Sequence, residues 1–273
     1  MIDHARQRAP RKSVSGIFHS IAIQRRVIGA LLMREVLTRY GRHNVGFLWV
    51  FLEPILFTSG VTALWTLTKA VHGSQLPITA FAVTGYSSVL MWRNTANRCA
   101  LAITPNLGLL FHRNVRVIDL FLARIILEIA GITASATIIS IVFISFGVMQ
   151  PPADMGLVLL GWFYLAWFGT ALGLMVGGLS ERSDTAERLW HTVAYLMFPL
   201  SGAVFMVDWL PEAAQRYILL IPTVHGVEMF RGGFFGADVR VHYSIPYITV
   251  ACMVVTLIGL LLVRDVGNKV EFE

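Results

Sequence analysis

Apolar residues gather in six stretches, at about 47–68, 76–92, 118–147, 155–179, 189–207 and 244–263. A helix needs about 20 apolar residues to cross the hydrocarbon core of a bilayer, and several of these stretches satisfy that length. The second and the fifth are short or interrupted. The third is longer than a bilayer requires, so we expect its beginning to project into water. The pattern predicts an all-α polytopic membrane protein with six transmembrane helices.

The composition agrees with this prediction. Of the 273 residues, 56% are hydrophobic and only 14% are charged, whereas a soluble domain has about 25% charged residues. These values exclude a disordered chain, a coiled coil and an ordinary cytosolic enzyme. The two cysteines, Cys99 and Cys252, fall in different predicted compartments, so we expect neither a disulfide nor a thiolate metal site.

The basic residues fix the predicted orientation. If the N-terminus is cytoplasmic, all Lys and Arg residues lie inside except Lys69, Arg216, Arg231 and Arg240. Cytoplasmic segments of membrane proteins carry the excess of Lys and Arg. We therefore expect both termini in the cytoplasm.

The segment before the first span predicts an amphipathic helix. Within 29–42, apolar residues such as Leu32 and Val36 share one side of a helix, and most charged residues share the other. Such a helix lies on the inner membrane surface, either as a simple anchor or as a shelf for a cytosolic partner. We do not expect a signal peptide, because Arg25 and Arg26 interrupt the apolar stretch 17–33 and no small-residue cleavage site follows.

We divide the chain into four parts: a basic, flexible cytosolic tail (1–24), the interfacial amphipathic helix (25–46), the six-helix transmembrane domain (47–263) and a second cytosolic tail (264–273).

Several residues within the spans are unusual for hydrocarbon. Glu53, next to Pro54, places a carboxylate where burial costs about 3 kcal/mol or more, so we expect this helix to be covered by protein or to line a wet cavity. For Glu128 we favour a local pair with Arg124, one turn earlier. The candidates for a translocation path are Glu53, Phe57, Trp65, Trp162, Trp167 and Tyr195. For the aromatic members, interfacial packing is the simpler interpretation.

The fourth span carries Gly169, Gly173 and Gly177, a doubled G-x-x-x-G pattern. Without side chains at these positions, a second helix can approach closely. The pattern predicts tight packing but does not identify the partner helix.

The segment 208–243, which we call the hairpin, is too long for a tight turn and too interrupted for a span. Pro211, Pro222 and Gly232-Gly233 predict two short helices, from about 211 to 221 and from 223 to 232. We expect a periplasmic re-entrant hairpin between the last two spans, which is permitted at membrane depth only under protein cover or beside a cavity. The gate candidates are Trp209, Pro211, Pro222, His225, Glu228 and Arg231.

His225, Glu228 and Arg231 follow one another at a spacing of three residues. One His–Glu pair is an incomplete zinc site, so we predict no metal and a local hydrogen-bond or ion-pair cluster instead. The chain also contains no G-x-x-x-x-G-K-[ST] phosphate loop and no G-x-G-x-x-G motif. It therefore has no known way to bind ATP by itself, and its basic residues line a membrane face without interleaved aromatics, which excludes a nucleic-acid partner.

Three segments resemble one family in matching order: LLMREVLTRYGRHNVGFLWVFLEPILF (31–57), NLGLLFHRNVRVIDLFLARIILE (106–128) and PTVHGVEMFRGGFFG (222–236). They are similar to ABC exporter permeases for capsular polysaccharide, over roughly 25–263. The resemblance implies a non-catalytic subunit of the Gram-negative inner membrane. Two copies would pair with two ATPase subunits that bind ATP and Mg, while this chain binds no cofactor. The cargo would be a lipid-linked, usually acidic polysaccharide.

The resemblance also suggests which segments act. The N-terminal helix and the region of about 93–116 would receive the motion of the ATPase, which makes the coupling candidates Arg34, Glu35, Arg39, Arg42, Arg98, Arg113 and Arg116. Periplasmic and outer-membrane polysaccharide export proteins are further candidate partners. An exporter of O-antigen, of a teichoic-acid-like polymer or of a drug would share the fold. A membrane enzyme or a scaffold without ATPase is a remote alternative, because Glu53, Glu128 and His225 lie at different predicted depths.

Overall fold

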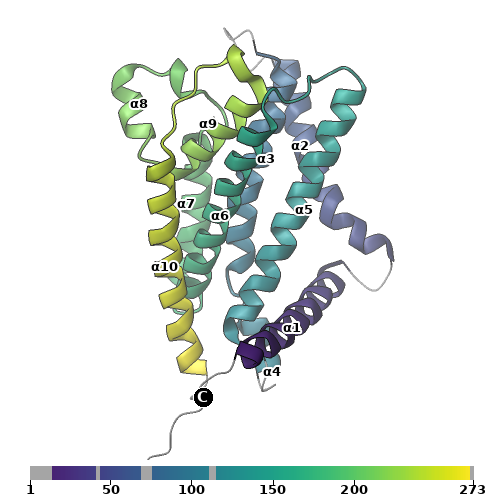
Figure 1. Ribbon diagram of the computed structural model, residues 1–273, viewed down its shortest axis with the longest axis vertical. Helices are drawn as coiled ribbons and strands as arrows, with labels where there is room; N and C mark the ends of the chain where they lie inside the picture. The colour runs from purple at the N-terminus through teal and green to yellow at the C-terminus, as the bar shows by residue number, and fades with distance from the viewer. Residues whose placement is uncertain (1–13, 41–43, 69–75, 111–114, 271–273) are drawn as a thin grey trace, which may run out of the picture.

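The computed structural model describes residues 14–40, 44–68, 76–110 and 115–270, and every regular element in these ranges is a helix. The all-α prediction is confirmed for this part of the chain. Six helices run alongside one another (Figure 1): α2 (Asn44–Thr68), α3 (Ile78–Cys99), α5 (Val117–Ser145), α6 (Met155–Ser180), α7 (Asp184–Leu200) and α10 (Ile245–Val270). Among the described residues, α5, α6 and α10 are long and apolar enough to cross a membrane.

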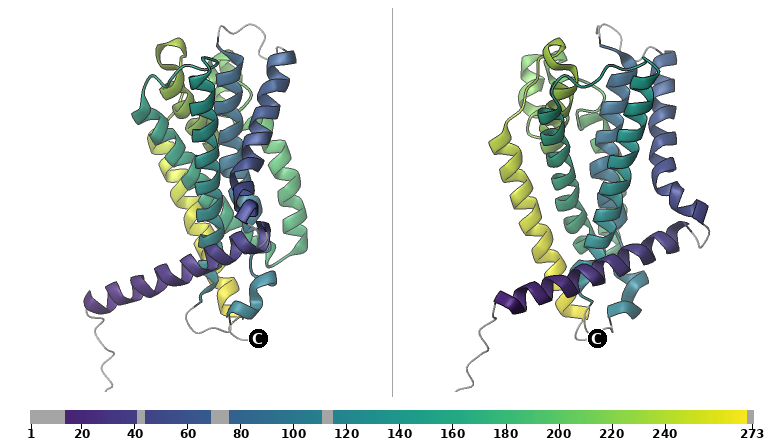
Figure 2. Two further views of the ribbon diagram at one scale, coloured as in Figure 1. Left: turned by 90° about the vertical axis from the view of Figure 1, so that its right-hand side faces the viewer. Right: turned by 45° about the vertical axis from the view of Figure 1, so that its right-hand side comes forward.

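The shorter elements lie at the two ends of this bundle. Helix α1 (Val14–Tyr40) crosses one end, as Figure 2 shows, and the last turn of α10 lies at the same end. The η1 turn (Thr104–Asn106) and α4 (Leu107–Leu110) follow α3 there. The opposite end holds the hairpin, which contains η2 (Val207–Trp209), α8 (Glu212–Ile218), α9 (Pro222–Phe235) and η3 (Gly236–Asp238). We call these the α1 end and the α9 end.

Helix α6 is the centre of the packing, and its glycines explain why. A Cβ atom added at Gly169 would lie 2.9 Å from the carbonyl oxygen of Met91, and one at Gly177 would lie 2.9 Å from that of Cys99. The doubled G-x-x-x-G pattern therefore packs against α3, which is the partner that the sequence alone did not identify. At Gly161 an added Cβ would lie 2.5 Å from the backbone nitrogen of Phe230, so α9 approaches α6 equally closely.

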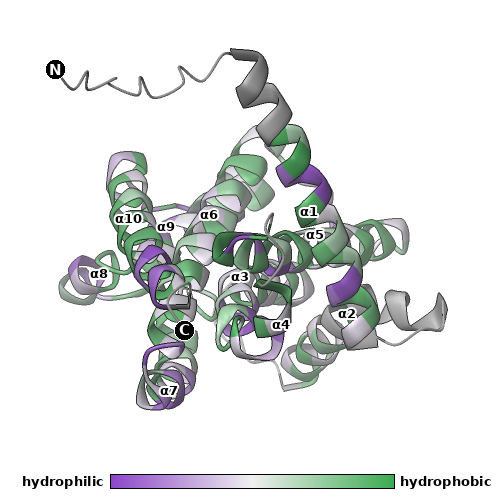
Figure 3. Cartoon of the chain, turned by 90° about the horizontal axis from the view of Figure 1, so that it is seen from below, coloured by the Kyte–Doolittle hydropathy of each residue, from purple (hydrophilic) through white to green (hydrophobic). Residues whose placement is uncertain are grey.

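Viewed from the α1 end, the long helices present mainly hydrophobic residues (Figure 3). Exposed apolar side chains are frequent on their outer surfaces, including Leu67 on α2 and Leu257 on α10. A soluble protein rarely exposes so many large apolar side chains together. The surface is that of a bundle whose surroundings are apolar.

Several helices differ in extent from the sequence prediction. Helix α1 begins at Val14, within the segment 1–24 that we expected to be a flexible tail. Helix α3 continues beyond residue 92 to Cys99. Helix α7 begins at Asp184, in the expected loop, and ends at Leu200 rather than at 207. Acidic residues in the first turn of a helix, here Asp184 and Glu187, favour its N-terminus, so hydropathy alone placed this start too late.

The hairpin contains the two short helices that its sequence predicts, but the second continues past Gly232-Gly233 to Phe235. These glycines serve close packing rather than helix termination, because a Cβ added at Gly233 would lie 2.4 Å from the backbone nitrogen of Val158 in α6. Helix α9 ends at Gly236, whose φ of +59° is available at little cost only to glycine.

Candidate functional site

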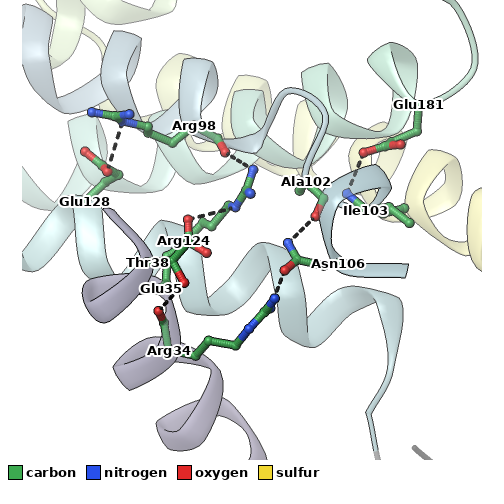
Figure 4. Close-up of polar contacts among 10 residues, drawn as sticks. All are labelled: Arg34, Glu35, Thr38, Arg98, Ala102, Ile103, Asn106, Arg124, Glu128 and Glu181. Atoms are coloured by element: carbon green, nitrogen blue, oxygen red, sulfur yellow. Dashed lines mark hydrogen bonds and ion pairs between the residues drawn. The ribbon is translucent and has the colours of Figure 1, made fainter. Parts of the chain in front are cut away.

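A set of polar side chains joins five elements at the α1 end, and we call it the α1-end network (Figure 4). From α1, Glu35 pairs with Arg124 of α5 at 3.2 Å. Arg124 also donates to the backbone carbonyl of Arg98 at 2.8 Å, and the Arg98 guanidinium lies 3.4 Å from Glu128. The network thus ties α1 to α5 and α5 to α3.

A second connection runs from α1 to the turn after α3. Arg34 donates to the side-chain oxygen of Asn106, and Asn106 donates to the backbone carbonyl of Ala102 at 2.8 Å. Glu181, just after α6, accepts hydrogen bonds from the backbone nitrogen of Ile103 at 2.6 Å and from the Thr104 hydroxyl at 3.0 Å. The turn 101–106 is therefore held between α1 and α6.

The first turn of α5 is fixed in a similar way. The Asp119 carboxylate accepts from the backbone nitrogen of Arg116 at 2.9 Å, which forms part of a capping box at the start of α5. Gln24 of α1 donates to the other oxygen of Asp119. Helix α1 consequently contacts α5 through polar side chains at two places along its length.

Burial strengthens the pair between Glu35 and Arg124. The side chains of Glu35 and Arg124 expose only 15% and 13% of their surfaces. Removing one partner from a buried charged pair costs far more than removing one partner of an exposed pair, because the remaining charge loses its compensation. The α1-end network therefore ties α1, the turn 101–106 and the ends of α3, α5 and α6 to one another.

Of the predicted coupling residues, the structure brings Arg34, Glu35 and Arg98 into this network, while Arg116 caps α5. The side chain of Arg39, and all of Arg42 and Arg113, lie outside the described residues. Glu128 reaches Arg98 of α3, and Arg124 reaches Glu35 of α1, so both residues have a partner on another helix.

Asn106, Asp119 and Glu181, in the network or beside it, were not among the residues predicted from the sequence. Glu181 gives a usable signal, since it is an acidic residue directly after a long apolar stretch. Asn106 begins the second of the segments that resemble a known family, but no local pattern indicates that it accepts a bond from a residue 72 positions earlier.

At the α9 end, Arg231 is completely buried and acts as a hydrogen-bond donor to the turn after α7. Its guanidinium donates to the carbonyl of Gly202 at 2.6 Å, to that of Phe205 at 2.7 Å and to that of Ala203. The same group lies 3.6 Å from the ring centroid of Phe81 in α3. Arg231 therefore joins α9, the end of α7 and α3.

Glu228 and His225 attach other parts of the hairpin to α9. The Glu228 carboxylate accepts from the backbone nitrogens of Val207 at 3.0 Å and His242 at 2.9 Å. His225 bonds through Nε2 to the carbonyl of Leu219 at 2.8 Å and accepts at Nδ1 from the backbone nitrogen of Ser244 at 3.0 Å.

The residues of the predicted cluster bond to backbone groups outside α9, and Glu228 and Arg231 also attract each other electrostatically. Within the described ranges, no group of three His, Cys, Asp or Glu residues is placed to hold a metal ion.

The remaining gate candidates mark element boundaries. Trp209, in η2, stacks on Phe81 with ring centroids 5.2 Å apart. Pro211 precedes the first residue of α8, and Pro222 occupies the first turn of α9, where its missing N–H costs nothing. Phe81 of α3 therefore contacts both Arg231 of α9 and Trp209 of η2.

The translocation-path candidates do not share one environment. Trp162 donates to the Thr133 hydroxyl at 2.9 Å, Trp167 donates to that of Thr256 at 3.1 Å, and Trp65 packs near Phe81. Phe57 and Tyr195 are exposed on α2 and α7, respectively. The side chain of Glu53 lies outside the described residues. The three tryptophans thus serve interhelical packing, the simpler of the two interpretations.

Comparison with known proteins identifies the family. The model of the ABC-2 type transporter family, which describes membrane subunits, matches residues 26–235. The chain belongs to the ABC-2 type transporter family. The match contains the residues of the α1-end network that join α1 to Arg124 and Asn106, and also His225, Glu228 and Arg231 of α9. In an ABC-2 type transporter the membrane subunit is non-catalytic and ATP hydrolysis takes place in a separate subunit.

Curated relatives cover nearly the whole ABC-2 chain. It is 47% identical to the capsule polysaccharide export inner-membrane protein CtrC of Neisseria meningitidis serogroup B, over 94% of this chain and 97% of CtrC. It is 42% identical to the capsule polysaccharide export inner-membrane protein BexB of Haemophilus influenzae, over 92% and 95%. The polysialic acid transport protein KpsM of Escherichia coli is 24% identical over 89% and 94%.

Proposed function

We infer that this chain is the inner-membrane permease of an ATP-driven exporter of capsular polysaccharide. The observation that carries this conclusion is the 47% identity, over almost the full length of both chains, to a capsule polysaccharide export inner-membrane protein. Similarity of that extent supports a shared fold and a shared class of cargo. The absence of any phosphate-loop motif from the sequence agrees with a subunit that depends on a partner for ATP hydrolysis.

The membrane arrangement belongs to this proposal. Helices α2, α3, α5, α6, α7 and α10 form the six spans, with the α1 end and both chain termini in the cytoplasm and the α9 end in the periplasm. Helix α1 lies at the inner membrane surface, extending the interfacial segment 25–46 toward the N-terminus. The excess of basic residues in the segments at the α1 end supports this orientation. The hairpin then reaches the outer leaflet under the cover of α3 and α6.

In the complete exporter, two copies of the chain pair with two ATPase subunits. The ATPase subunits contact the α1 end, through α1 and the segment 101–116, and the α1-end network carries their motion into α3, α5 and α6. The coupling contacts are made by Arg34, Glu35, Arg39, Arg42, Arg98, Arg113 and Arg116 or through the segments that hold them. Since Arg34 and Glu35 already bond within the chain, their contribution is to keep α1 attached to the bundle.

The hairpin acts as the outer gate. Arg231 and Glu228 hold its turns against the end of α7 and against α3, so displacement of α3 or α7 displaces the hairpin. The cargo is lipid-linked and acidic, as supported by the similarity to a polysialic acid transport protein. It passes along a route that includes the surfaces of α2 and α7 near Phe57 and Tyr195.

Reconstitution tests this function directly. The chain is purified with its ATPase, and ATP hydrolysis and polymer entry into vesicles are measured with capsular glycolipid, O-antigen glycolipid and a panel of drugs. We expect stimulation and transport with the capsular glycolipid only. ATP hydrolysis that is stimulated by O-antigen or by a teichoic-acid-like polymer would contradict the proposed cargo but still support an exporter. Activity of the chain without an ATPase would favour a membrane enzyme and overturn the proposal.

Cysteine labelling tests the orientation. The native cysteines, Cys99 and Cys252, are buried, so a cysteine introduced at the exposed Glu212 of α8 reports on the α9 end alone. A membrane-impermeant maleimide added to whole spheroplasts is expected to label Glu212→Cys and not a cysteine at the exposed Arg188 of α7. The reverse pattern contradicts the proposed topology.

A further inference from the structure

A groove runs between α5 and α6 near the α9 end, with a volume of about 220 Å³. Its walls come from the second half of α5, between Thr133 and Ile144, and from the first half of α6, between Met155 and Trp162. Helices α3 and α9 form the floor, through Ser87 and Phe230 among others. Figure 1 shows the connection between α5 and α6 passing over this end of the two helices.

The lining of the groove is apolar in its chemistry, although its sequence contains several hydroxyl groups. No charged residue is among the described residues that line it. The hydroxyls of Thr84 and Thr137 donate to carbonyls of their own helices, both at 2.8 Å, and the Thr133 hydroxyl accepts from Trp162. Three of the five hydroxyl groups in the lining are therefore already partnered, and apart from Ser87 and Ser140 the walls present mainly carbon to an occupant.

That chemistry discriminates between candidate occupants. A sugar would bring many hydroxyl groups into a groove that has no charged residue among its described lining and in which most hydroxyl groups are already engaged. Burying unpaired polar groups is costly. An alkyl chain has no polar groups to satisfy and gains from each methylene that it buries. The groove consequently suits hydrocarbon and not polysaccharide.

The position of the groove indicates where such an alkyl chain would come from. Both helices that form its mouth, α5 and α6, are long and apolar enough to cross a membrane. Its rim carries the large apolar side chains of Ile141, Met155 and Leu159, all more than half exposed. The groove is therefore continuous with a surface that faces lipid tails. At the other end it is closed by Trp162, which bonds to Thr133 and packs on Phe230 with ring centroids 5.2 Å apart.

We propose that this groove is a binding site for one acyl chain of a membrane phospholipid, inserted between α5 and α6 and ending against Trp162. The acyl chain fills the space between α5 and α6, so an occupied groove keeps the two helices apart at the α9 end. The site requires only that α5 and α6 cross a membrane, and it is independent of the identity of the exported polymer.

Photolabelling tests the proposal on the full chain with its ATPase. The complex is placed in vesicles of phosphatidylethanolamine and phosphatidylglycerol that carry a diazirine on one acyl chain, with no glycolipid present. We expect label on residues 133–144 of α5 and 155–162 of α6. Each methylene excluded from a buried site weakens binding, so displacing two or more lowers labelling of the groove by about tenfold. Ala136→Trp, which places an indole inside the groove, is expected to have this effect.

Two further variants keep the test decisive. Ser140→Trp fills the groove nearer its open end and substitutes for Ala136→Trp if that variant does not assemble. Ile138→Trp adds an indole at an exposed position of α5 that does not line the groove, and its labelling is expected to match that of the wild type.

If the groove residues are labelled equally in the wild type and in both filled variants, the label comes from annular lipid alone, and the proposal is overturned. A disulfide between Ser140→Cys residues of two copies would assign the groove to a subunit contact and overturn it as well. Labelling that appears only when glycolipid is added would assign the groove to the cargo's lipid anchor, against the proposed phospholipid. None of these outcomes depends on ATP-driven transport, so failure here is distinct from failure of the export function.

Discussion

The Arg231 guanidinium lies 2.6 Å from the carbonyl oxygen of Gly202, in the turn that follows α7. Helix α7 ends at Leu200, so Gly202, Ala203 and Phe205 lie beyond its regular helical hydrogen bonds. In apolar surroundings each such carbonyl needs a partner from the protein. A planar guanidinium supplies several donors at fixed angles, and here it serves Gly202, Ala203 and Phe205 together.

Replacing Arg231 therefore should destabilise the α9 end. We expect Arg231→Gln to lower the free energy of unfolding by about 2–5 kcal/mol, because several buried carbonyls lose their donor. Arg231→Lys keeps the charge but not the planar group with several donors, so we expect an intermediate loss of stability. Thermal unfolding in detergent measures both. Arg216→Gln, at an exposed position of α8, is the control and should change little. Equal melting temperatures for all four proteins would contradict the role assigned to Arg231.

The Glu35–Arg124 pair gives a second prediction, because it joins α1 to α5 at 3.2 Å. If the α1-end network transmits the motion of the ATPase, Glu35→Gln and Arg124→Gln each reduce polymer-stimulated ATP hydrolysis. The double variant should lose less than the sum of the two single losses, with a coupling energy of about 0.5–3 kcal/mol in a double-mutant cycle. Strictly additive losses would mean that the two residues act separately.

The hydrophobic pattern predicted the long helices well, because a membrane span depends on a run of consecutive apolar residues. All six apolar stretches correspond to helices, and the GxxxG pattern of 169–177 correctly indicated close packing. Helix boundaries were predicted less well where polar residues continue a helix beyond the apolar stretch. The first turn of α7 is one such case, since Asp184 and Glu187 suit a helix N-terminus but not a hydropathy window.

The sites were harder to predict because their bonds connect residues that are distant in sequence. The spacing of His225, Glu228 and Arg231 suggested a local hydrogen-bond or ion-pair cluster. It did not indicate that Arg231 bonds to carbonyls 26 to 29 positions earlier and to Phe81 of α3. Arg34 was predicted as a residue that couples to the ATPase, and no local pattern indicated that it donates to Asn106. Local periodicity identifies which face of a helix is polar, but it does not show whether that face meets water, a partner or another helix.

Gly161 provides a third prediction, on the packing of α6 against α9. A Cβ there would lie 2.5 Å from the backbone nitrogen of Phe230. A backbone atom cannot move aside as the end of a flexible side chain can. We expect Gly161→Ala to cost about 1–3 kcal/mol of stability, as overpacking does. Gly60→Ala on α2 is the matched control, because nothing lies within 4 Å of the added carbon. It should leave stability unchanged or raise it, since alanine favours a helix over glycine. Unfolding of the two variants is compared by melting temperature, and a loss in Gly60→Ala equal to that in Gly161→Ala would contradict this prediction.

His225 connects the stability of the hairpin to pH. Its Nδ1 accepts from the backbone nitrogen of Ser244 at 3.0 Å, and its Nε2 bonds to the carbonyl of Leu219 at 2.8 Å, so the ring is neutral with its proton on Nε2. Burial lowers the pKa of His225, and the bond to the Leu219 carbonyl opposes this shift only in part. Protonation would remove the acceptor that Ser244 uses.

The sign of the pH effect follows from this lowered pKa. The unfolded chain binds a proton at His225 more readily than the folded chain does, so stability rises with pH in the interval between the two pKa values. The contribution is fully present above about pH 6.5, the ordinary pKa of histidine, and is lost as the pH falls through the folded value. Acidification should therefore loosen the bonds of α9 to the start of α10.

Melting temperatures of the wild type and of His225→Gln, recorded from pH 8 to pH 5, test this prediction. Glutamine retains a donor and an acceptor but does not titrate, so we expect the variant to lose less stability than the wild type as the pH falls. Subtracting the two curves removes the contributions of the other histidines. His191→Gln, at an exposed position of α7, is the matched control and should follow the wild-type curve. If His225→Gln and the wild type fall in parallel, the neutral His225 ring does not contribute to the stability of the hairpin.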